Sequence, residues 1–132
     1  MSAEALGLRP SALRGLPVVE QTFPALLERQ AAAYGDKPLL RVGDDERSYV
    51  AVRDGAARAG AVLTDAGVAP GDRVAIMAGN RVEFLELLLG LAWIGAVAVP
   101  LNTAMRGTSF AHAIENSGAR LLAIESELLE RL

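Results

Sequence analysis

This sequence of 132 residues contains no cysteine, one histidine and few aromatic residues, which make up 5% of the chain. Without cysteine it can form neither disulfides nor thiolate metal sites, and it offers no cysteine nucleophile. The single histidine, His112, has Glu115 and Asn116 near it in sequence but no second metal ligand. A general base also needs a reaction partner, so we interpret His112 as a surface residue.

The chain also lacks an apolar run long enough to cross a bilayer. Its main apolar run, from Leu87 to Val99, has 13 residues, whereas a membrane-spanning helix needs about 20. The opening 21 residues contain no apolar segment of signal-peptide length. The net charge of −3 argues against nucleic acid as a partner. We therefore expect a cytoplasmic protein with no membrane span and no nucleic-acid partner.

The most informative stretch runs from Pro70 to Asn102 and predicts a strand, a helix and a second strand. The last two turns of the helix are apolar on nearly all sides, which is typical of a helix covered by several neighbours. Because a helix joins the two strands, they should be parallel, with a right-handed crossover. We expect strands at 73–78 and 97–99, and we expect the helix at 81–94 to be the most buried one.

Residues with special backbone properties mark the limits of these elements. Asn80 is placed to cap the helix through its side-chain oxygen, and Gly95 offers the left-handed residue that ends it. Pro100 should end the second strand, because proline cannot donate to the ladder of a central strand. Gly79 and Asn80 could instead hold an anion at the helix N-terminus, but we favour the plain, capped helix start.

The other residues predict three more helices, a β-hairpin, a third strand of the sheet and a partial last helix. Together these elements predict an α/β fold of three layers. A mostly parallel sheet would lie between helices, with a β-hairpin to one side. Residues 1–21 show no clear period and are interpreted as a flexible lead-in to a partial α/β domain at 22–132. The chain is expected to end inside a helix. The expected elements are a helix from Thr22 to Gly35 with Pro24 in its first turn, a hairpin of 39–42 and 47–49, a helix at 50–66, a helix at 108–117, a strand at 121–124, and a helix that Ser126 caps.

Two further features have a plain structural interpretation. Asp44, Asp45 and Glu46 could suggest a metal site, but no ligand spacing follows them, so we predict a solvated acidic turn. Trp93 lies at the end of the apolar helix, where a core position is more common than a stacking platform. Neither feature predicts a catalytic site.

In order along the chain, four stretches carry a family resemblance: TFPALLERQAAAYGDKPLL, RSYVAV, AGVAPGDRVAIMAGNRVEFLELLLGLAWIGAVAVPLN and ENSGARLLAI. Together they resemble the N-terminal segment of adenylate-forming enzymes, the AMP-binding superfamily. The segment LNTAMRG is most similar to acyl-CoA synthetases, including the crotonobetaine/carnitine–CoA ligase type. The resemblance implies a full-length ligase that uses ATP and Mg²⁺ to convert a carboxylate into acyl-AMP and then passes the acyl group to CoA.

The same resemblance places the family's phosphate loop, its Mg²⁺-binding carboxylate and its catalytic lysine in segments that this chain does not contain. We therefore expect no catalytic residue and no cofactor or metal bound by this chain alone. The one candidate for a ligand contact is Arg106, because in acyl-CoA synthetases this connection can approach the CoA nucleotide. A basic side chain there could pair with a CoA phosphate, although a solvated surface arginine is the alternative.

A second hypothesis is a stand-alone, non-catalytic α/β binding or interaction module, such as a flavodoxin-like receiver. A receiver needs acidic residues at strand ends to hold Mg²⁺, and the first predicted strand ends in Gly79 and Asn80 instead. A third is a piece that assembles through its apolar surface. As partners we expect the remainder of the same polypeptide or a self-associating copy, with a homo-oligomer as the result.

Overall fold

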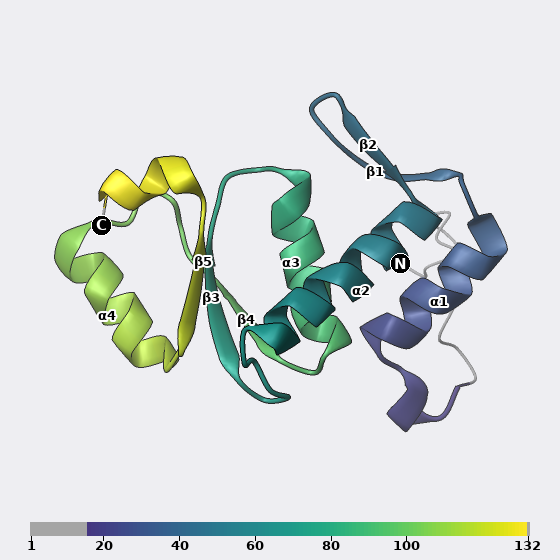
Figure 1. Cartoon of the computed structure of the whole chain (residues 1–132), viewed down its shortest axis with the longest axis horizontal. Coiled ribbons are helices and arrows are strands. Elements are labelled where there is room, and N and C mark those ends of the chain that lie inside the picture. The colour runs from purple at the N-terminus through teal and green to yellow at the C-terminus, as the bar shows by residue number, and fades with distance from the viewer. Residues whose placement is uncertain (1–15, 132) are drawn as a thin grey trace, which may run out of the picture.

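The structure, a computed structural model, describes residues 16–131. A parallel sheet lies between two groups of helices, with α2 and α3 on one side and α4 on the other (Figure 1). A separate antiparallel hairpin, β1–β2, projects beside α2, and α1 packs on the outside of α2. In chain order the elements are the 3₁₀ helix η2 (Val18–Glu20), α1 (Phe23–Tyr34), β1 (Pro38–Val42), β2 (Asp45–Ser48), α2 (Tyr49–Asp65), β3 (Arg73–Met77), α3 (Val82–Trp93), β4 (Val97–Pro100), α4 (Gly107–Ser117), β5 (Leu121–Ile124) and the 3₁₀ helix η3 (Ser126–Arg131).

The sheet confirms the expected strand–helix–strand unit. Its order is β4-β3-β5, and both outer strands run parallel to β3. Val74 pairs with Ala98 of β4 and with Leu121 of β5. Pro100 remains within β4 rather than ending the strand before it. The sheet tolerates this proline because β4 is an edge strand.

The core is centred on β3, because that strand is covered on both faces and both edges. The side chains of Val74, Ala75, Ile76 and Met77 are at most 1% exposed. Leu91 of α3 is fully buried in the same cluster. A second cluster lies between α1 and α2, where Trp93 packs against it as expected of a core residue.

Small residues allow α2 and α3 to approach closely. A Cβ atom added to Gly90 would lie 2.6 Å from Ala59 Cβ and 2.9 Å from Gly60 N. Contacts this short exclude any side chain at that position. A Cβ atom on Gly60 of α2 would lie 3.0 Å from Ile94 Cγ2 and 3.3 Å from Gly90 O, so packing against α3 explains this glycine, which weakens an isolated helix.

The ends of several helices agree with the sequence. Thr22 Oγ1 accepts a hydrogen bond from Ala25 N–H, with Pro24 in the first turn of α1. Gly35 closes α1 with a positive φ of 54°, and Gly95 follows α3 with a φ of 74°. These turns need a left-handed backbone, which glycine adopts without steric cost.

Three local expectations are wrong. Asn80 does not cap α3: Arg81 is the N-cap residue, and no side chain caps the helix there. Ser126 begins a 3₁₀ helix, not an α-helix. Asp45 and Glu46 lie in β2 and not in the turn, because Val42 pairs directly with Asp45 and only two residues connect the strands.

The expectation that α3 is the most buried helix is met only in part. Only Glu83 is exposed in α3, but three residues of α3 are fully buried, compared with five in α2. Most of α3 is half-buried, because the described elements cover it on two sides. Of the predicted lead-in, residues 1–15 lie outside the described residues, and η2 occupies part of the rest.

Candidate functional site

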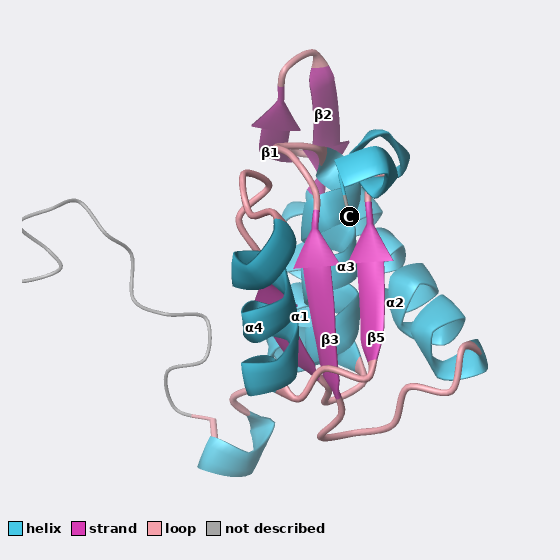
Figure 2. Cartoon of the chain, turned by 90° about the vertical axis from the view of Figure 1, so that its left-hand side faces the viewer, coloured by secondary structure: helices cyan, strands magenta, loops and turns pink. Residues whose placement is uncertain are grey.

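The strand order creates a change of direction beside β3. The crossover through α3 carries the chain from β3 to β4, and the crossover through α4 carries it back across β3 to β5, on the opposite face (Figure 2). In open parallel sheets, ligands bind outside the carboxyl ends of strands at such a switch point. The region where β3 and β5 end is therefore the candidate site that the topology favours.

A crevice of about 220 Å³ opens at this switch point. Its floor is apolar and comes from the strand ends and the first turns of α3. Its rim carries charge, with Arg81 and Glu83 on one side and Glu125 on the other. The floor residues are Ala78, Phe84, Leu87, Ala123 and Ile124.

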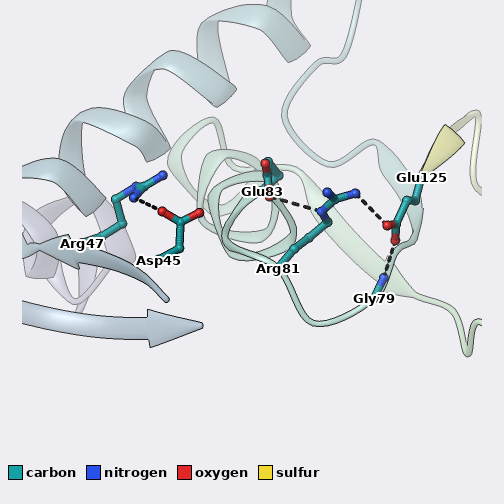
Figure 3. Close-up of polar contacts among 6 residues, drawn as sticks. All are labelled: Asp45, Arg47, Gly79, Arg81, Glu83 and Glu125. Atoms are coloured by element: carbon teal, nitrogen blue, oxygen red, sulfur yellow. Dashed lines mark hydrogen bonds and ion pairs between the residues drawn. The ribbon is translucent and has the colours of Figure 1, made fainter. Parts of the chain in front are cut away.

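Glu125, which directly follows β5, joins the two sides of the crevice (Figure 3). Its Oε2 accepts a hydrogen bond of 2.8 Å from Gly79 N–H, and its Oε1 accepts one of 2.7 Å from Arg81 Nη1. Arg81 Nε also lies 3.3 Å from a Glu83 carboxylate oxygen. The hydrogen bond from Gly79 N–H, and next one with Glu127, lower the pKa of the Glu125 carboxyl; desolvation opposes them, and the charge of Arg81 adds a smaller lowering effect.

This arrangement explains why Asn80 is not the cap. The backbone at Arg81 is extended, with φ −145° and ψ 160°, and its side chain reaches the carboxylate of Glu125. The protein therefore places its own carboxylate where an anion could otherwise approach the start of α3. Chemically, the cluster is a clamp between the end of β5 and the loop after β3, with its charges already paired.

Arg106, the candidate from the sequence, lies elsewhere, in the connection between β4 and α4. It is the N-cap residue of α4, and no side chain caps that helix. Its Nη1 donates to Thr103 O and to Met105 O, each at 2.6 Å. The residue is exposed, and within residues 16–131 neither its Nε nor its Nη2 has a protein acceptor.

The remaining sequence candidates do not form a site. His112 is exposed, and its Nε2 lies 2.9 Å from Asn116 Nδ2. Asp45 pairs with Arg47 at 2.8 Å, and Glu46 pairs with Arg41 at 2.7 Å. Across residues 16–131, no three potential metal-ligating side chains gather.

The sequence pattern does not predict the contact between Glu125 and Arg81, because the two residues follow different strands, β5 and β3. A usable signal was present, because both Gly79 and Glu125 lie just beyond the carboxyl end of a predicted parallel strand. Such ends meet at one edge of a sheet. The Glu125 carboxylate follows one strand and the backbone N–H of Gly79 follows the other. This arrangement predicts a contact between the two groups.

Comparison with known proteins identifies the family. Residues 27–132 match the family model described as AMP-binding enzyme. The chain belongs to the AMP-binding enzyme family. It is 35% identical over 113 residues to the medium/long-chain fatty acid–CoA ligase FadD6 of Mycobacterium tuberculosis, a match that covers 86% of this chain and 19% of that ligase.

Solved structures of AMP-binding enzymes agree with the fold. A Mycobacterium tuberculosis fatty acyl CoA synthetase is 30% identical with a TM-score of 0.77, over 83% of this chain and 22% of that one. The anthranilate CoA ligase AuaEII, in complex with anthranoyl-AMP, has a TM-score of 0.78 at 24% identity, over 99% of this chain and 23% of that one. The latter likeness concerns the fold alone.

The chain spans about a fifth or less of the length of the curated relatives that it matches. In residues 16–131, none of the helices combines the length and apolar character that crossing a bilayer requires.

Proposed function

We propose that this chain is the N-terminal part of an ATP-dependent acyl-CoA synthetase. The observation that carries the proposal is the family match over residues 27–132, together with 35% identity to a fatty acid–CoA ligase. The complete enzyme would join a carboxylate to AMP with release of pyrophosphate and then form a thioester with CoA. None of the relatives named above is a crotonobetaine/carnitine–CoA ligase, and that finer assignment remains a prediction of the sequence.

The complete enzyme would use ATP, Mg²⁺ and CoA. The described residues do not fit Mg²⁺, because no three potential ligands gather among them, and the sequence has no GxxxxGK[ST] loop to hold phosphates. No step of adenylation is therefore assigned to this chain. Its proposed role is to supply a folded α/β unit on which the rest of the same polypeptide packs, with a cytoplasmic location as in the sequence prediction.

Within this unit, we assign Arg106 a contact with a phosphate of CoA. The two local hydrogen bonds to Thr103 O and Met105 O hold Nη1 of its guanidinium group. The residue is exposed beside the N-terminus of α4, where the helix dipole also favours an anion. A charge-assisted hydrogen bond to a phosphate suits this geometry.

A second acceptor is supported by one relative. The fatty acid–[acyl-carrier-protein] ligase ScoC of Streptomyces coeruleorubidus is 42% identical over 65 residues, which cover 49% of this chain. An enzyme of that kind would pass the acyl group to the thiol of a carrier protein in place of CoA. Both candidates share the adenylation step and differ only in the acceptor.

Two half-reactions test these proposals in the complete enzyme that carries this segment. Carboxylate-dependent exchange of pyrophosphate into ATP measures adenylation, and mass spectrometry with CoA or a carrier protein identifies the acceptor. We expect exchange with fatty acids and a thioester with CoA. Absence of exchange with every carboxylate tried would contradict the enzyme assignment, and a thioester on the carrier protein alone would favour the second candidate. The 132-residue chain by itself should release no pyrophosphate, because it lacks the groups that position ATP.

A further inference from the structure

We draw no further inference here: the strongest candidate, the crevice at the ends of β3 and β5 with Arg81, Glu83 and Glu125 on its rim, belongs to the site already described, and its charged groups pair with one another rather than pointing to a ligand.

Discussion

The helices α3 and α4 begin in nearly the same way but are fixed by different contacts. Arg81 precedes α3 with φ −145° and ψ 160°, and Arg106 precedes α4 with φ −145° and ψ 155°; neither helix has a side-chain cap. Arg81 binds the carboxylate of Glu125, 44 residues further along the chain. Among the residues that the structure describes, Arg106 binds only the carbonyl groups of Thr103 and Met105.

The two helices also differ in burial. α3 contains three fully buried residues, including Gly90 and Leu91 against α2 and the sheet, and α4 contains none. The start of α3 is therefore part of the folded core, and the start of α4 is a local turn whose arginine is exposed. Contacts distant in sequence stabilise the first region, whereas local contacts hold the second.

The largest expected effect comes from the packing of α3. Gly90→Ala should destabilise the chain by about 1–3 kcal/mol, even though alanine is the better helix former, because the new Cβ would meet Ala59 Cβ at 2.6 Å. Urea unfolding followed by circular dichroism measures the change. Ala111→Val, on the exposed side of α4, is the matched control and should change stability by less than about 0.5 kcal/mol. Equal effects of the two variants would remove the contrast between the helices.

The next effect concerns the clamp at the start of α3. Glu125→Gln removes the carboxylate that accepts from Gly79 N–H and pairs with Arg81. We expect a lower thermal midpoint and faster hydrogen exchange at the Gly79 amide. Glu83→Gln, which removes a longer and more exposed ion pair with the same arginine, should have little effect. Equal rates of hydrogen exchange at the Gly79 amide in the two variants would show that the Glu125 contacts do not stabilise the start of α3.

A pH titration sharpens the same test. Because the folded protein lowers the pKa of Glu125 below its ordinary value of 4.5, the carboxylate stabilises the fold at pH values above the unfolded pKa. This contribution is lost as the pH falls through the lowered, folded pKa. The difference in thermal midpoint between the natural chain and E125Q should thus be constant near neutrality and shrink in acid. A difference that stays constant down to full protonation would contradict the assigned role of the charge.

The smallest effect on stability is expected at the start of α4. Arg106→Ala should change the free energy of unfolding by less than about 0.5 kcal/mol, because the side chain is exposed and its bonds are local. In the complete enzyme, the same substitution should raise KM for CoA several-fold and leave adenylation nearly unchanged. Arg58→Ala, at an exposed position of α2, is the control and should alter neither. Equal loss in both half-reactions would make Arg106 structural.

Local rules were sufficient for most of the secondary structure. The apolar runs, the Thr22 cap and the glycines at 35 and 95 specify elements whose limits agree closely with those observed. These signals act over a few residues, through backbone sterics and capping hydrogen bonds, so a sequence contains them in full. The parallel direction of β3 and β4 follows equally from the helix between them.

The sequence alone also determined the family, because the order of several motifs along the chain carries that information. Only the tertiary structure decided where α3 begins and what closes the crevice beside it. Asn80 is a good cap by local rules, but Arg81 is the N-cap residue, and its side chain binds Glu125, which also accepts from Gly79 N–H in the loop before the helix. The strand order that places β5 beside β3 is a long-range property, so no window of neighbouring residues contains it.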